Sequence, residues 1–241
     1  MAASSRANEA SIKPDPASTS DMPSPDSHRV PLDAPRDALR HPDLFMDFAG
    51  VQRGDNVLEI GGGDGYTAMT LAQRVGPQGS VLAVNPPQWH DFMAPYLAAR
   101  VEHGPVPGVT FVERPFDNPV RADETPLDLV VCVLIYHDLL YLDVDRAEMN
   151  RRLFAALKPG GRFLIIDHAA AHSHDTSVGG TLHRIGRQSV IEELTAAGFV
   201  LAAESDALRV PEDPRTGLAW SNPQPRTDRF TLLFERPKGS S

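Results

Sequence analysis

The chain has 241 residues, which is enough for one domain with a complete hydrophobic core and some polar excess. Its 23 Lys and Arg residues against 32 Asp and Glu residues give a net charge of −9, and a chain this acidic repels the phosphate backbone of nucleic acid. No apolar run approaches the roughly 20 residues that span a bilayer, and the N-terminus lacks the apolar core of a secretion signal. We therefore expect a cytoplasmic protein without a nucleic-acid or membrane partner. The protein could form a homodimer.

Composition divides the chain into three stretches. Residues 1–27 are rich in Ala, Ser, Pro and Asp and contain almost no large apolar side chains, so they are predicted to form a disordered tail. In residues 28–53, Leu44, Phe45 and Phe48 follow helical spacing, which predicts a helical cover over the domain that follows. The main folded domain is expected over residues 54–237.

From residue 54 onward, predicted strands and helices alternate. Parallel strands are expected at 56–60, 80–84, 109–113, 127–135 and 162–167. Helices are expected at 66–75, 88–103, 144–157 and 187–197, with Pro95 breaking the second and LKPGG stopping the third. Segments 199–207 and 229–235 are expected to pair as an antiparallel hairpin across a long loop.

This alternation predicts a Rossmann-like α/β fold. A doubly wound, mostly parallel sheet with an antiparallel C-terminal hairpin would lie between two helical layers, in a three-layer αβα arrangement. The single cysteine, Cys132, lies within an apolar strand and is interpreted as a small buried hydrophobe.

The most informative segment is NVLEIGGGDGYTA, where a strand runs into Gly61, Gly62, Gly63 and Gly65. Glycines allow a sharp turn and a close approach of the backbone to a ligand. The G-x-G-x-G spacing puts Tyr66 where a dinucleotide fingerprint has its last glycine. Glu59, just before the turn, suits the amino-acid end of a cationic ligand and would repel a pyrophosphate.

VLEIGGGDGYTA resembles the first motif of class I methyltransferases, and the LKPGG turn before the fifth strand also fits that family. The resemblance covers roughly residues 50–236. The stretches RHPDLFMDFAGVQRGDNVLEI, IYHDL, DH followed by TLHRIG, and SDALRVPEDPRT with TDRF are similar to a group of predicted methyltransferases. The resemblance implies S-adenosylmethionine as the cofactor, and the acidic charge favours a small-molecule acceptor.

The resemblance also implies positions for the cofactor contacts. The family usually has an acidic residue at the end of the second strand that binds the ribose hydroxyls. Asn85 takes that place here, and its amide oxygen can still accept a hydrogen bond. Phe116 could pack on the adenine and Asp117 could accept from its amino group, although Asp117 is an equally good helix N-cap. Tyr136 is expected to stack on the cofactor.

Polar side chains follow the fourth and fifth strands and recur in TLHRIG; they are His137, Asp138, Asp167, His168, His183 and Arg184. Because ligands of open α/β sheets bind at the carboxyl ends of the strands, we expect these side chains to share one crevice. His137 is the first choice for a general base, oriented by Asp138 or Asp167, and His168 and His183 are the second choices. Arg184 could grip a substrate carboxylate, and each of these residues could instead only support the fold.

Imidazole and carboxylate groups are suitable ligands for zinc or iron. Outside the HSH of a loop (His172 and His174), the histidines lack the spacing of a metal motif, so no metal site is predicted. Two alternatives to a methyltransferase stay open: a nicotinamide-dependent oxidoreductase and a non-catalytic S-adenosylmethionine-binding protein. The long loop, with Arg215, Trp220 and Arg226, is a candidate lid.

Overall fold

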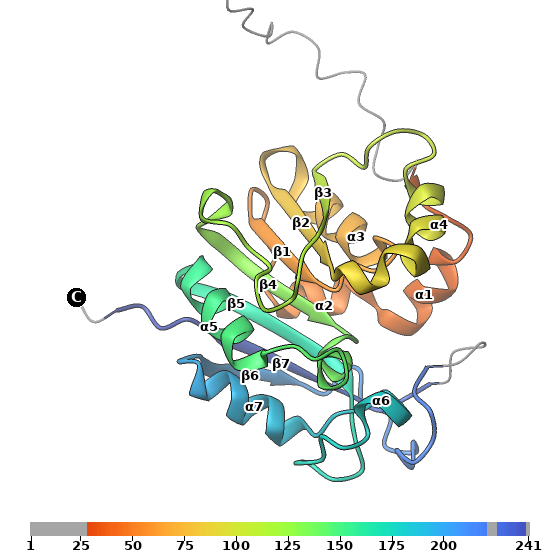
Figure 1. Cartoon of the computed structure of the whole chain (residues 1–241), viewed down its shortest axis with the longest axis vertical. Coiled ribbons are helices and arrows are strands. Elements are labelled where there is room, and N and C mark those ends of the chain that lie inside the picture. The colour runs from red at the N-terminus through yellow and green to blue at the C-terminus, as the bar shows by residue number, and fades with distance from the viewer. Residues whose placement is uncertain (1–27, 221–225, 240–241) are drawn as a thin grey trace, which may run out of the picture.

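The computed structural model describes residues 28–220 and 226–239, so the predicted tail lies outside the described residues. Within these ranges, seven strands form one sheet in the order β3-β2-β1-β4-β5-β7-β6 (Figure 1). The parallel strands are β1 (Asn56–Ile60), β2 (Ser80–Asn85), β3 (Val109–Glu113), β4 (Leu127–Val133) and β5 (Leu157–His168). The antiparallel pair is β6 (Val200–Ser205) and β7 (Arg229–Glu235). The predicted mixed sheet is confirmed.

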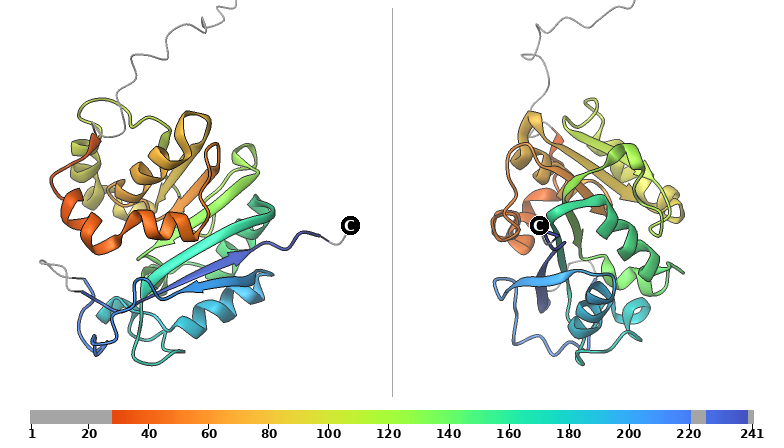
Figure 2. Two further views of the ribbon diagram at one scale, coloured as in Figure 1. Left: turned by 180° about the vertical axis from the view of Figure 1, so that it is seen from behind. Right: turned by 90° about the vertical axis from the view of Figure 1, so that its left-hand side faces the viewer.

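Helices cover both faces of the sheet, as the two views of Figure 2 show. One face carries α1 (Asp33–Arg40), α2 (Pro42–Phe48) and α3 (Tyr66–Val75), and the other carries α5 (Arg146–Ala156) and α7 (Arg187–Ala196). The remaining helices are α4 (His90–Arg100) and the short α6 (Gly179–Leu182). No helix in the described ranges is long and apolar enough to cross a membrane.

Burial along the strands follows their place in the sheet. The central strand β4, LDLVVCV, is buried almost throughout, as a continuous apolar run in a parallel sheet predicts. Cys132 within it has no exposed surface, and burial raises the pKa of its thiol, so the interpretation as a buried hydrophobe is confirmed. The edge strand β6 alternates between exposed and half-buried positions.

Several predicted boundaries were wrong for local reasons. β4 ends at Val133 because Leu134 adopts a left-handed φ of 60°, after which the chain forms a 3-10 helix. β5 begins at Leu157 because LKPGG continues as strand, with Leu157 opposite Leu127. Pro95 does not break α4; it lies in the second turn, where its missing N–H removes one backbone hydrogen bond.

The N-terminal helices share the core of the sheet. Phe45 and Met46 of α2 are buried together with side chains of α3. Asp33 of α1 forms an ion pair with Arg100 at the end of α4, at 2.6 Å, and neither side chain has exposed surface. Residues 28–53 are thus attached to the sheet by apolar packing and by a buried ion pair.

Candidate functional site

The glycine turn follows β1 at the carboxyl edge of the parallel strands. A Cβ atom on Gly61, Gly62 or Gly65 would lie between 2.6 and 2.8 Å from a neighbouring side chain, so packing requires glycine at these positions. Gly63 differs, because a Cβ there would meet only the carbonyl oxygen of Gly61, at 3.9 Å. Gly63 therefore faces space that a ligand could occupy.

Asn85, at the end of β2, is bound to this turn. Its Oδ1 accepts a hydrogen bond from the Gly63 N–H at 2.8 Å, and its Nδ2 donates to the Gly63 carbonyl at 2.9 Å. The side chain is buried. Asn85 thus fixes the shape of the turn. Its Oδ1 has a second lone pair, with which it could accept a hydrogen bond from a ribose hydroxyl.

Glu59 lies against the turn, because its Oε2 would be 3.5 Å from a Cβ on Gly62. Its Oε2 is buried and has no hydrogen-bond partner among the described residues, and the same holds for the Nε atoms of Arg40 and Arg229. Burial raises the pKa of Glu59 to about 8, although the charge of Arg40 opposes that rise. Burial also lowers the pKa of Arg229 to about 10. Because buried polar groups are normally paired, this set fits a ligand that carries both an ammonium and a carboxylate.

The start of α3 is unsuited to a pyrophosphate. The backbone N–H of Tyr66 donates to the Asp64 carboxylate at 3.3 Å, and the Tyr66 hydroxyl donates to the Asp37 carboxylate at 2.7 Å. A dinucleotide would therefore place its phosphates beside the carboxylates of Asp64 and Glu59. This arrangement disfavours the nicotinamide alternative.

Two predicted cofactor contacts lie elsewhere. Phe116 is almost fully buried and packs edge-on against Trp89, with 5.7 Å between the ring centroids, so it belongs to the core. Tyr136 is fully buried, and its hydroxyl donates to Glu193 of α7 at 2.8 Å and accepts from Asn150. Its side chain therefore faces the helical layer, and the structure does not support the predicted stacking of Tyr136 on a cofactor.

Asp117 lies in a turn after β3. The Asn118 N–H donates to the Pro115 carbonyl across this turn at 2.9 Å, and no helix begins there in the described ranges. The N-cap interpretation is therefore wrong. The predicted contact of Asp117 with adenine stays a prediction.

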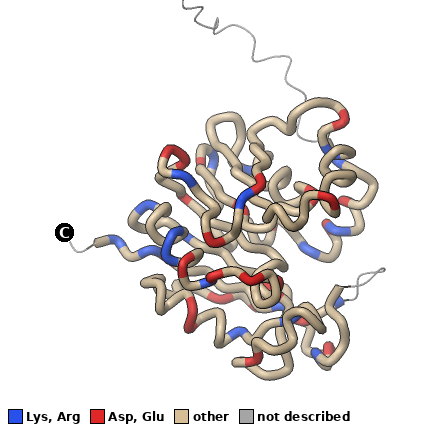
Figure 3. Tube along the Cα trace, viewed as in Figure 1, with Lys and Arg blue, Asp and Glu red and all other residues tan. Residues whose placement is uncertain are grey.

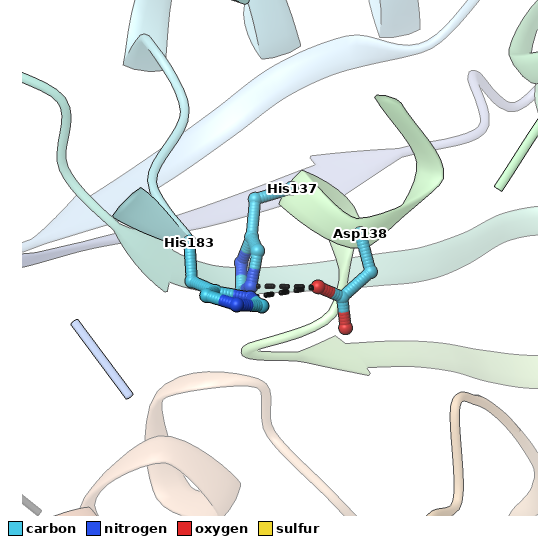
Figure 4. Close-up of side chains that lie close together, drawn as sticks. All are labelled: His137, Asp138 and His183. Atoms are coloured by element: carbon cyan, nitrogen blue, oxygen red, sulfur yellow. Dashed lines mark hydrogen bonds and ion pairs between the residues drawn. The ribbon is translucent and has the colours of Figure 1, made fainter. Parts of the chain in front are cut away.

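Four of the predicted catalytic residues lie together and are called the His-Asp cluster: His137, Asp138, Asp167 and His183. His137 Nδ1 lies 2.6 Å from Asp167 Oδ1, and His137 Nε2 lies 2.9 Å from Asp138 Oδ1. His183 Nδ1 lies 3.3 Å from the same Asp138 oxygen, so both rings converge on one carboxylate (Figure 4). The side chains of His137 and Asp138 are 4% and 11% exposed, against 27% for His183, so the cluster opens on the His183 side.

A glycine at the start of α6 brings His183 to the cluster. His137 and Asp138 lie in the 3-10 helix Tyr136–Leu140 after β4, and α6 packs against it. A Cβ on Gly179 would lie 2.7 Å from the His137 carbonyl oxygen, so only glycine permits this approach. His183 ends α6 with a left-handed φ of 52°, an uncommon conformation for a residue other than glycine.

The two carboxylates determine the charge of His137. Burial opposes the charged imidazolium, but Asp167 and Asp138 outweigh it and raise the pKa of His137 to about 10. Both ring nitrogens then donate to carboxylates at neutral pH, and His137 has no lone pair with which to accept a proton. Burial by itself would raise the pKa of Asp138, yet hydrogen bonds from His137 and His183 hold it below its usual range. The geometry therefore argues against His137 as the general base and leaves His183 as the more open histidine.

The side chains of His168 and Arg184 form their hydrogen bonds outside the cluster, although the ring centroid of His168 lies 5.9 Å from that of His137. His168 Nδ1 hydrogen-bonds the Thr227 hydroxyl at 2.7 Å, and burial together with the charge of Arg229 holds the pKa of His168 well below its usual range. The Arg184 guanidinium pairs with Asp213 at 2.9 Å and donates to the Gly217 carbonyl at 2.9 Å. Its donors are thus bound within the protein, and the structure does not support the predicted grip on a substrate carboxylate.

The long loop between β6 and β7 is held at its base by ion pairs. Buried Asp228 accepts from Arg209 and Arg215, each at 2.8 Å, and Figure 3 shows acidic and basic positions close together there. Arg215 is therefore engaged at the base of the loop. Trp220 is 60% exposed, and its ring lies 6.5 Å from that of His183. Residues 221–225 lie outside the described part, so the lid stays a prediction.

Sequence reasoning missed three residues of this region. Arg40 and Arg229 contribute unpartnered cationic atoms, and the Tyr141 hydroxyl donates to Asp138 Oδ1 at 2.7 Å. Arg40 belongs to the N-terminal helices, whose position on the sheet does not follow from hydrophobic periodicity. Tyr141 lies four residues after His137 in the YHDLLY segment, and that proximity is the signal that could have indicated it.

A family model described as a methyltransferase domain matches residues 57–161, which include the glycine turn, Asn85 and the start of the cluster. Residues 57–161 therefore form a class I S-adenosylmethionine-dependent methyltransferase domain. S-adenosylmethionine is the methyl donor of that family. The region matched by the family model begins after Arg40 and ends before His183, so neither residue lies in it.

Curated relatives match the same region. The ubiquinone/menaquinone biosynthesis C-methyltransferase of Proteus mirabilis is 30% identical over 125 residues, which cover 51% of this chain and 46% of that protein. The protein-L-isoaspartate O-methyltransferase of Thermotoga maritima is 30% identical over 123 residues, covering 51% of this chain and 34% of that protein. The chain thus spans about half the length or less of these two relatives.

Solved structures share the fold over more of the chain. A SAM-dependent methyltransferase from Aquifex aeolicus superposes with a TM-score of 0.62 at 19% identity, covering 88% of this chain and 97% of that one. A methyltransferase from Mesorhizobium loti gives 0.55 at 18% identity, covering 80% and 96%. At these identities the likeness shows the fold alone.

Proposed function

We propose that this protein transfers a methyl group from S-adenosylmethionine to a small-molecule acceptor bound beside the His-Asp cluster. The observation that carries the proposal is the set of unpartnered buried atoms on Glu59, Arg40 and Arg229, together with Gly63, which faces open space in the turn directly after Glu59. That set matches the methionine end of the cofactor and does not match a pyrophosphate. S-adenosylmethionine supplies an electrophilic methyl group on its sulfonium.

The chain's own residues would bind the cofactor as follows. The Arg40 and Arg229 guanidinium groups, which have unpartnered Nε atoms, would hold the methionine carboxylate, and Glu59 would accept from the ammonium. A cation beside Glu59 favours its ionised form and so offsets the effect of burial on its pKa. Asn85 holds the Gly63 peptide in place, and Asp117 is the candidate partner of the adenine amino group.

The His-Asp cluster would bind the acceptor and assist its deprotonation. Asp138 accepts from His183 Nδ1, which leaves His183 Nε2 as the ring nitrogen able to take a proton from the acceptor. His137 would remain an imidazolium that orients Asp138, with Asp167 fixing the ring from the other side. This assignment keeps the predicted histidine assistance and moves the proton acceptor from His137 to His183.

A small molecule is the favoured acceptor because of the charge of the chain. A net charge of −9 opposes binding to phosphate backbones. Two named relatives methylate carbon in one case and oxygen in the other, so the acceptor atom is left open in the proposal.

Calorimetric titration tests the proposal. We expect S-adenosylmethionine and its demethylated product to bind the full-length protein, and NADH not to bind. Gly63→Val should abolish both interactions because the side chain would fill the ligand's space. Gly104→Val is the matched control, since Gly104 also has a positive φ and open space around it. Binding of NADH alone would replace the proposal with the oxidoreductase alternative, and normal affinity in Gly63→Val would show that the site is misplaced.

A further inference from the structure

We propose that the His-Asp cluster is a binding site for one divalent transition-metal ion of the zinc type, with His137 Nε2, a carboxylate oxygen of Asp138 and His183 Nδ1 as its ligands. These three atoms lie within 4.8 Å of one another. The binding site is independent of the proposed methyl transfer; only the ion's role in that reaction would rest on it.

The distances between the ligand atoms suit such an ion. Zinc binds imidazole nitrogen and carboxylate oxygen at about 2.0–2.2 Å, so ligand atoms at neighbouring tetrahedral corners lie about 3.3–3.5 Å apart. His183 Nδ1 and Asp138 Oδ1 are 3.3 Å apart, and His137 Nε2 and Asp138 Oδ1 are 2.9 Å apart. An ion would therefore replace the protons that now link the two rings to Asp138, with small movements of the side chains (Figure 4).

The groups around these ligands are arranged as in a metal site. Asp167 has no exposed surface and lies 2.6 Å from His137 Nδ1, so it fixes the tautomer that leaves Nε2 for a metal. It also accepts from the backbone N–H of His137 at 2.8 Å, which holds the ring's own backbone in place. The Tyr141 hydroxyl likewise donates to Asp138 at 2.7 Å. Carboxylate–histidine–metal contacts of this kind orient the ligands and raise their basicity.

The charge of the cluster also favours a cation. The carboxylates of Asp138 and Asp167 lie at 2.9 and 2.6 Å from the two ring nitrogens of His137. A divalent ion bound to two neutral imidazoles would place its positive charge beside both carboxylates. Two imidazoles and one carboxylate select Zn²⁺, Fe²⁺ or Co²⁺ over Mg²⁺ and Ca²⁺, which prefer oxygen ligands.

Three protein ligands leave one tetrahedral position open, as in catalytic zinc sites. The cluster is most exposed at His183, and the Trp220 ring lies beside it. The open position would therefore face the side from which an acceptor enters. If the proposed function holds, an acceptor with an ionisable oxygen would bind there, and the ion would lower the pKa of that group in place of a free histidine.

Metal titration of the full-length, chelator-treated protein tests the site. We expect one equivalent of Zn²⁺ by calorimetry, visible absorption bands of tetrahedral Co²⁺, and no displacement of either ion by Mg²⁺. His183→Ala and Asp138→Asn should each weaken binding by at least about tenfold, and Asp167→Asn by about 10- to 100-fold. His174→Ala is the matched control, because it removes an exposed histidine outside the cluster.

Co²⁺ bound beside Trp220 should also quench its fluorescence, and acetohydroxamate, an oxygen ligand, should shift the Co²⁺ bands by filling the open position. Absence of Zn²⁺ and Co²⁺ binding in the wild type, or equal affinity in His183→Ala, would overturn the proposal. Bands that acetohydroxamate does not change would overturn the open position. A parallel titration with S-adenosylmethionine on the same samples separates failure of the metal site from failure of the proposed function.

Discussion

Replacing Asp167 with asparagine tests the electrostatics of the His-Asp cluster in the metal-free protein. The carboxylate is fully buried and accepts three hydrogen bonds, from the N–H and Nδ1 of His137 at 2.8 and 2.6 Å and from the N–H of His168 at 2.7 Å. Asparagine has one acceptor oxygen and one donor nitrogen, so at least one donor would face another donor. The His137 imidazolium would also lose the carboxylate that contributes most to raising its pKa.

The magnitude follows from the buried pair. Removing one partner of a buried ion pair costs about 3–5 kcal/mol. The pKa of His137, about 10 in the folded protein, exceeds the unfolded value of about 6.5, and at 1.36 kcal/mol per pKa unit this corresponds to about 5 kcal/mol for the whole cluster. The two figures describe overlapping interactions and are not added.

The pH dependence has a definite sign. Because the folded pKa is raised, the stabilisation is complete below about pH 6.5 and is lost as the pH rises toward 10. Urea unfolding at several pH values across this window should show wild-type stability falling with pH, and Asp167→Asn should be less stable by several kcal/mol at the acid end with a shallower fall. Asp43→Asn, at an 88% exposed side chain, is the matched control. A change below about 1 kcal/mol, or an unchanged pH slope, would refute the reasoning.

Three further predictions concern the proposed cofactor-binding residues and the loop between β6 and β7. Arg40→Met should weaken S-adenosylmethionine binding by about tenfold or more, since a charge-assisted hydrogen bond is worth about 1.5–3 kcal/mol, and calorimetry would contradict this if affinity were unchanged. Affinity for S-adenosylmethionine should rise as the pH passes through about 8, because Glu59 with its raised pKa ionises there, and Glu59→Gln should remove that rise. Arg184→Leu should lower the free energy of unfolding by about 3–5 kcal/mol by leaving Asp213 without its buried partner, and retained stability would show that the loop does not depend on this pair.

The fold followed from the sequence where periodicity and turn chemistry agreed. The run LDLVVCV indicated a central parallel strand, and the glycines after Glu59 indicated the turn before α3; both lie where they were predicted. Strand ends were less predictable, because the left-handed Leu134 and the bulge after Leu127 depend on tertiary contacts.

The candidate site was only partly predictable for a related reason. Strand ends are fixed by topology, so His137, Asp138 and Asp167 could be expected to lie together. The direction of a side chain is decided by packing, which turned Tyr136 toward Glu193 and Arg184 toward Asp213. The contribution of Arg40 depends on how α1 lies on the sheet, and hydrophobic spacing within a helix does not encode that position.

The Asp33–Arg40 helix has a consequence for where an independently folding fragment can begin. Its first residue neutralises Arg100, and His28 Nδ1 hydrogen-bonds the carbonyl oxygen of the same arginine at 3.1 Å. A fragment that started at the glycine turn would lose Asp33, which accepts from both Nη atoms of Arg100, and would keep Asp64, at 3.5 Å, as a carboxylate partner of that guanidinium. Loss of one partner of a buried ion pair costs about 3–5 kcal/mol, which is comparable with the total stability of many domains. The smallest fragment that folds on its own should therefore begin at or before His28. The sheet without the Asp33–Arg40 helix would lack this buried ion pair.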